Sequence, residues 1–124
     1  MNDEARKYLE GMLQRRGYIA EEHRQLAEAD LDWLKAYDAF VQTTYIKPRL
    51  LDRRTKELLQ TAVMVALGAP AERVEPHMRI ALEHGVSPEE LLETLQVVIM
   101  PMGAAAFLAG FKIWVDVTAA HARR

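Results

Sequence analysis

Glu57 and His77 are the two side chains of this chain whose types and spacing could do chemistry together. One is a carboxylate and the other an imidazole, and they lie on two successive segments with helical periodicity. An imidazole changes its charge near neutral pH, and a buried carboxylate beside it would tune that change. The pair therefore predicts general acid–base chemistry, provided that the two side chains meet.

Each of the two residues also has a structural interpretation. Glu57 borders the polar face of its predicted helix, where a surface salt bridge with Arg53 or Arg54 would explain it without any function. His77 shares a helix face with apolar residues such as Val74, so we expect it to point inward. An inward histidine is more often a core residue with satisfied hydrogen bonds than a catalyst. Spacing alone leaves these interpretations open.

Other candidate sites have weaker support. The chain has no cysteine, which excludes disulfides, thiolate metal sites and a cysteine nucleophile. Its histidines are scattered and none stands in a Glu-x-x-His or His-Glu-x-x-His pattern, so we expect no metal site. His84 could line the same groove as His77, although its neighbours favour the surface. Glu93 is a weak candidate because it adjoins an apolar run, whereas Glu89 and Glu90 suit the first turn of a helix.

The composition limits the class of protein. A chain of 124 residues, 50% hydrophobic and 27% charged, fits a single globular domain over residues 1–124. The net charge of -2 predicts no nucleic-acid partner. The first residues include no basic segment followed by an apolar run, so we expect a cytoplasmic protein. Pro101, Gly103 and Gly110 interrupt the uncharged stretch 94–111, which favours buried helices over a membrane span.

The elements that must position Glu57 and His77 are all helical, since strand signals are nearly absent. The spacing predicts helices over about residues 3–16, 20–44 (with a break near 29–30), 52–67, 71–84, 87–100 and 104–119. Asp52 is a predicted N-cap, and Ser87 and Glu90 predict a capping box. Gly17 and Gly85 are predicted helix ends. Together these signals predict an all-α bundle.

The last predicted helix is apolar almost all round, a pattern typical of a helix that is buried on every side. The remaining chain is short, so its own surface can hardly surround a terminal helix. Phe107, Phe111 and Trp114 are therefore predicted to lie near a subunit interface. The alternative is that these three side chains fill the core of the protomer.

Residues 51–93 resemble the carboxymuconolactone decarboxylase family, through LDRRTKELL at 51–59, His77, and ALEHGVSPEE at 81–90. A weaker likeness extends over about residues 34–117, which leaves 1–33 as an N-terminal helical extension. The resemblance implies an alkylhydroperoxidase D-like bundle of about six helices. It also implies that protomers assemble into a homo-oligomer, a trimer or a hexamer.

In the redox branch of this family, a Cys-x-x-Cys pair precedes the histidine and works with it and a glutamate as a proton relay. Glu57 and His77 match the glutamate and the histidine, but the cysteine positions fall on Pro70 and Arg73. Neither residue can supply a thiolate, so we expect no thiol peroxidase. The decarboxylase branch also lacks the cysteines. Its members need no cofactor and act on small carboxylated lactones from the breakdown of aromatic compounds.

The resemblance to the decarboxylase branch implies a role for each candidate residue. His77 would transfer the proton, Glu57 would orient it and tune its pKa, and Arg53, Arg54 or Arg73 would hold the anionic substrate. A family signature marks a fold more securely than a reaction. The alternative is therefore a non-catalytic helical oligomer that binds a small apolar acid. Glu57 and His77 within hydrogen-bond reach beside an enclosed pocket would favour the enzyme, whereas a His77 packed in apolar contacts with no cavity would favour the structural interpretation.

Overall fold

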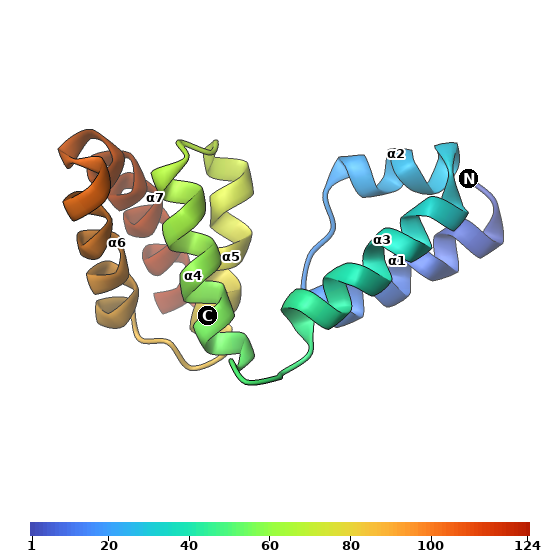
Figure 1. Cartoon of the computed structure of the whole chain (residues 1–124), viewed down its shortest axis with the longest axis horizontal. Helices are drawn as coiled ribbons and strands as arrows, with labels where there is room; N and C mark the ends of the chain where they lie inside the picture. The colour runs from blue at the N-terminus through green and yellow to red at the C-terminus, as the bar shows by residue number, and fades with distance from the viewer. The chain divides into compact units, whose positions relative to one another are not determined.

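The computed structural model describes all residues 1–124, and every element in it is a helix. Seven α-helices and one short π-helix follow one another along the chain (Figure 1). The predicted all-α class is therefore confirmed. The chain divides into two compact units, an N-terminal unit (Met1–Leu50) and a C-terminal unit (Leu51–Arg124). Each unit contains a hydrophobic core of its own.

The N-terminal unit consists of three α-helices, the last of which runs on into the π-helix. These elements are α1 (Asp3–Arg16), α2 (Glu21–Ala29), α3 (Leu31–Val41) and η1 (Gln42–Ile46). Its core joins Ala5, Leu9 and Met12, which recur on one face of α1, to Ala27 of α2 and Leu34 of α3. This spacing of apolar residues is what holds the three short helices together.

Local residue types set the boundaries in the N-terminal unit. Gly17 ends α1 with a φ of 86°, in the left-handed region that glycine adopts at little cost. The predicted break near residues 29–30 is confirmed. There the carboxylate of Asp30 caps α3 by accepting a hydrogen bond from the Trp33 N–H.

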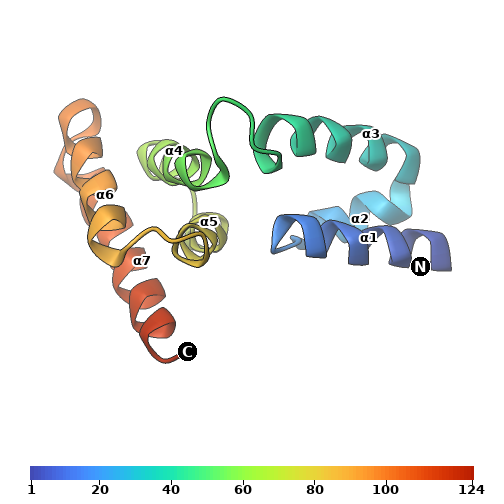
Figure 2. The same ribbon diagram turned by 90° about the horizontal axis from the view of Figure 1, so that it is seen from below.

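The C-terminal unit contains the predicted site. Its helices are α4 (Arg53–Ala66), α5 (Ala71–Glu83), α6 (Pro88–Met102) and α7 (Ala104–Ala122). α4 and α5 are joined by a short turn and lie side by side in both views (Figures 1 and 2), and Figure 1 shows that they run in opposite directions. Val65 of α4, Val74 and Met78 of α5, and Leu91 and Leu95 of α6 belong to one core cluster.

The helix boundaries of the C-terminal unit follow the predicted signals. Asp52 caps α4, and Ser87 and Glu90 exchange two hydrogen bonds of 3.0 Å in a capping box at the start of α6. α6 runs past its predicted end and carries Pro101 in its last turn, where the proline lacks the N–H that would otherwise donate to the carbonyl one turn earlier. The break lies at Gly103, whose φ is 83°.

α7 is not buried on all sides within the protomer. Only Gly110 and Val117 are fully buried, whereas Leu108, Phe111 and Val115 are exposed. A Cβ atom on Gly110 would lie 2.7 Å from Cγ1 of Val65, so the glycine allows α7 to approach α4 closely. No helix of the chain combines the length and the apolar character that crossing a membrane would need.

Candidate functional site

Glu57 lies on the buried face of α4. With Thr61 and Val65 it forms a stripe that recurs every fourth residue, and all three side chains are buried. The exposed fraction of Glu57 is 0%. The prediction that Glu57 lies at the border of the polar face was therefore wrong. The helices packed around α4 cover a side of it on which polar and apolar residues are mixed.

His77 lies on the inward face of α5, as its spacing predicted. It shares that face with Val74, Met78 and Ala81, and its exposed fraction is 6%. Nδ1 of the imidazole lies 3.0 Å from Oε2 of Glu57. The carboxylate and the imidazole therefore meet inside the C-terminal unit, between two antiparallel helices.

Arg53 completes the surroundings of the carboxylate. One turn before Glu57 on α4, its Nε donates a hydrogen bond of 3.0 Å to Oε1. The Arg53 side chain is only 11% exposed. The salt bridge predicted for Glu57 with Arg53 exists, but it is buried and so is not a surface pair. Glu57 is held between a guanidinium on one oxygen and an imidazole on the other.

The pKa of Glu57 reflects its burial. Burial raises the pKa of Glu57 above its ordinary value, and the hydrogen bond and charge of His77 reduce that rise without cancelling it. Glu57 therefore holds a proton more readily than an exposed glutamate does.

The remaining predicted residues lie outside this contact. Arg54 pairs with Glu90 across helices α4 and α6, and Arg73 is exposed near the start of α5. His84 is exposed, and its Nδ1 lies 2.9 Å from the carbonyl oxygen of Ile80 at the end of α5. Glu93 is exposed on α6. Of the residues expected at the site, the structure brings together Glu57, His77 and Arg53.

A cavity of about 110 Å³ lies elsewhere in the C-terminal unit, between α5 and the end of α7. Arg79, Leu82, Asp116, Val117 and His121 are among the residues that line it. Neither Glu57 nor His77 belongs to this lining. No group of three or more His, Cys, Asp or Glu side chains is placed to hold a metal ion.

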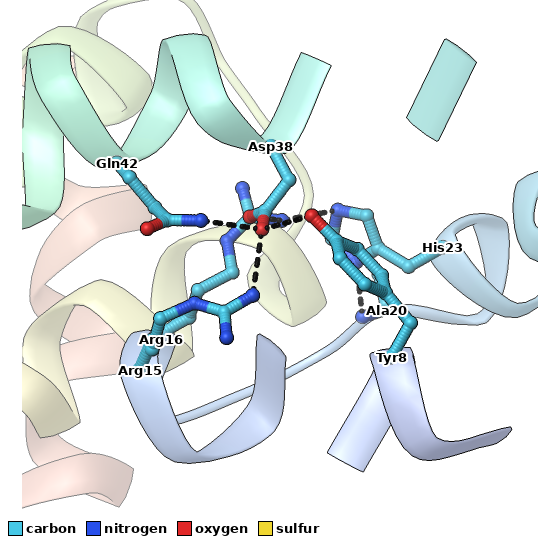
Figure 3. Close-up of polar contacts among 7 residues, drawn as sticks. All are labelled: Tyr8, Arg15, Arg16, Ala20, His23, Asp38 and Gln42. Atoms are coloured by element: carbon cyan, nitrogen blue, oxygen red, sulfur yellow. Dashed lines mark hydrogen bonds and ion pairs between the residues drawn. The ribbon is translucent and has the colours of Figure 1, made fainter. Parts of the chain in front are cut away.

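A second buried polar cluster, which sequence reasoning missed, lies in the N-terminal unit and is centred on Asp38 (Figure 3). Oδ2 of Asp38 accepts hydrogen bonds of 2.8 Å from Tyr8, Arg15 and Gln42. Arg16 lies 4.0 Å from the other carboxylate oxygen. The signal in the sequence was weak, because three of the four partners lie on α1, far from Asp38 in the sequence.

The pKa values in this Asp38 cluster reflect its burial. Burial raises the pKa of Asp38, but the hydrogen bonds from Arg15, Tyr8 and Gln42 outweigh it, so the net pKa is lowered. Burial and the bond to Asp38 raise the pKa of Tyr8 to about 12. The cluster thus holds a fixed negative charge beside a phenol that stays protonated, which suits a structural role in joining α1 to α3.

Comparison with known proteins adds to this geometry. Residues 32–116 match the carboxymuconolactone decarboxylase family, close to the range 34–117 expected from the sequence. No match was found among curated proteins or among solved structures. The matched region covers more than half of the chain and includes both Glu57 and His77. This chain therefore belongs to the carboxymuconolactone decarboxylase family.

Proposed function

We propose that this protein catalyses cofactor-independent decarboxylation of a small carboxylated lactone, or of a related acid from the breakdown of aromatic compounds. Glu57 and His77 act as its acid–base pair. The observation that carries the proposal is the buried contact of 3.0 Å between His77 Nδ1 and Glu57 Oε2. A buried carboxylate–imidazole pair is a common arrangement for moving a proton near neutral pH.

The reaction needs one proton to be delivered to carbon. When the bond between the substrate and its carboxylate carbon breaks, carbon dioxide leaves and the electron pair stays on the substrate, where a conjugated carbonyl can delocalise it. The imidazolium of His77 donates a proton to that carbon, and solvent returns the proton to His77 afterwards. Glu57 orients the ring and stabilises its charged form, while Arg53 holds Glu57 in place.

Arg54 and Arg73 are the proposed anchors for the substrate carboxylate. Arg53 is less suited to this role, because its side chain is 11% exposed, whereas that of Arg54 is 36% exposed. Arg73 is exposed near the start of the helix that carries His77. A guanidinium on the surface can bind an entering carboxylate through paired hydrogen bonds.

The test is turnover by the His77→Gln and His77→Ala variants on a panel of small carboxylated lactones, in deuterated water. We expect either variant to lose about 10²- to 10⁴-fold in kcat and to slow deuterium transfer to the product carbon. Arg54→Gln serves as a variant that should raise KM more than it lowers kcat. Full turnover by His77→Ala would remove His77 from the mechanism.

A second candidate is a non-catalytic helical oligomer that binds a small apolar acid. Apolar side chains exposed on α4, α6 and α7 favour an assembly of protomers, which we propose for either function. One experiment distinguishes the enzyme from the non-catalytic binder. A binder would bind a carboxylated lactone and release it chemically unchanged, at a rate unaffected by His77→Gln.

A further inference from the structure

Thr61 is a buried polar residue that the acid–base pair does not use. It lies one turn after Glu57 on the same face of α4, and its exposed fraction is 0%. Its hydroxyl oxygen has no hydrogen-bond partner in the protein. A buried hydroxyl without a hydrogen-bond partner lowers stability, so a threonine here calls for an explanation.

Two other helical threonines of this chain show what a hydroxyl ordinarily does. Thr94 donates to the carbonyl oxygen of Glu90 at 2.9 Å, and Thr118 donates to that of Trp114 at 2.7 Å. Both are bonds to the preceding turn of the same helix, the usual solution for threonine inside a helix. Thr61 does not make this bond, although the backbone of α4 offers it the same carbonyl position.

Thr61 lies close to the acid–base pair through its own helix. Side chains on a helix lean toward its N-terminus, so Thr61 leans over the turn that carries Glu57. Glu57 in turn contacts the imidazole of His77 on α5. The Thr61 hydroxyl thus shares the buried face of α4 with the carboxylate of the pair, next to a core that includes Val65 and Val74.

We propose that the Thr61 hydroxyl binds an oxygen ligand held against the Glu57–His77 pair. In the resting protein that ligand is a water molecule, and during turnover it is a carboxylate or carbonyl oxygen of the small acid. A hydroxyl both donates and accepts, so it suits either oxygen. The second half of this inference rests on the proposed function, whereas the first half does not.

The experiment compares Thr61→Val, which keeps the shape and removes the hydroxyl, with Thr61→Ser, which keeps the hydroxyl. Thr118→Val is the control, because it makes the same substitution at another helical threonine. Three properties are measured by NMR: transfer of magnetisation from water to the residue-61 side chain, the pH titration of the His77 ring, and the affinity for paraconate, a small lactone with one carboxylate. Denaturation with urea gives the stability of each variant.

We expect Thr61→Val to lose the water signal, to shift the His77 titration, and to bind paraconate about five- to tenfold more weakly. Thr61→Ser should behave like the wild type, as should Thr118→Val. If Thr61→Val does not fold, Thr61→Ala takes its place. An unchanged His77 titration and unchanged affinity, together with higher stability than the wild type, would overturn the inference.

The same experiment distinguishes a failure of the proposed function from a failure of the inference about Thr61. If the wild type does not bind paraconate, the water signal at Thr61 and the His77 titration still decide whether the hydroxyl holds an oxygen ligand. If the water signal is absent from the wild type and paraconate leaves the Thr61 resonances unchanged on binding, the inference about Thr61 is wrong while the acid–base role of His77 stands.

Discussion

At the scale of single residues, the central fact is that Glu57 is a carboxyl group without contact to solvent. Ionising such a group away from water is costly, and the pKa of Glu57 is raised for that reason. Arg53 and His77 reduce the cost because each offers a hydrogen bond and a positive charge to one oxygen. A protein that needed only a stable core would gain by placing an apolar residue there.

The raised pKa of Glu57 makes stability depend on pH in a defined direction. Below the unfolded-state pKa, the folded protein gains from a protonated, neutral Glu57, and that gain is lost as the pH rises through the folded-state pKa. We therefore expect Glu57→Gln to gain stability relative to the wild type as the pH rises above the ordinary glutamate pKa and through the raised folded-state pKa. Urea unfolding at a series of pH values measures the difference.

Glu93→Gln, an exposed change on α6, is the matched control for the loss of one carboxyl group. The difference in the free energy of unfolding between Glu93→Gln and the wild type should stay nearly constant over the same pH range. A Glu57→Gln variant that instead loses relative stability as the pH rises would mean that the pairing with Arg53 and His77 outweighs burial.

At the scale of elements, the N-terminal unit combines a small apolar core with the charged cluster of Asp38. Tyr8 and Arg15 come from α1, while Asp38 belongs to α3, so the bonds cross between helices that are far apart in sequence. Few apolar side chains are available to hold three short helices together. The cluster therefore contributes to the arrangement of the helices as well as to their stability.

Asp38→Asn tests this contribution. The amide cannot balance the positive charges of Arg15 and Arg16, so we expect the N-terminal unit to lose about 3 kcal/mol of stability at neutral pH. The loss should diminish as the pH falls through the lowered pKa of Asp38, since the wild type then loses the same charge. The pKa of Tyr8 should fall from about 12 toward its ordinary value.

Fluorescence of Trp33, in a Trp114→Phe background, monitors unfolding in the N-terminal unit, and Tyr8→Phe identifies the Tyr8 titration by difference. Asp32→Asn is the control, because Asp32 is an exposed carboxylate on the same helix. An Asp38→Asn variant as stable as the Asp32→Asn variant would show that the buried cluster contributes no net stability.

At the scale of the whole molecule, the C-terminal unit leaves a large amount of apolar surface exposed. Leu59 and Val63 on α4 and Leu67 at its C-cap recur every fourth residue and are 51%, 55% and 78% exposed. Phe107 and Trp114, two of the residues predicted near an interface, pack partly against the protomer core, and Phe111 is exposed. Exposed stripes of this kind are typical of surfaces that other chains cover.

We expect the wild type to sediment as an assembly of several protomers at micromolar concentration. Two lysines introduced by Leu59→Lys and Val63→Lys would place charges in the contact, so the double variant should sediment as a monomer with unchanged helix content. Phe111→Lys tests the predicted interface on α7 separately. A monomeric wild type would contradict the oligomer, and an unchanged assembly in the double variant would exclude the α4 stripe.

The sequence by itself determined the helices and most of their ends. Capping and glycine signals act locally, so Gly17, Asp52 and the Ser87–Glu90 box could be predicted from neighbouring residue types alone. The inward position of His77 followed from the spacing of apolar residues within its own helix. The family resemblance named Glu57 as its partner.

Only the tertiary structure decided how deeply Glu57 is buried and what it touches. The periodicity of α4 describes one helix, whereas burial depends on which of its sides α5, α6 and α7 cover. For the same reason the sequence left Arg53 open between a salt bridge with Glu57 and a substrate carboxylate, and only the structure shows its guanidinium bonded to Glu57. The unsatisfied hydroxyl of Thr61 and the Asp38 cluster are likewise products of packing, because their partners, or the lack of them, are set by distant parts of the chain.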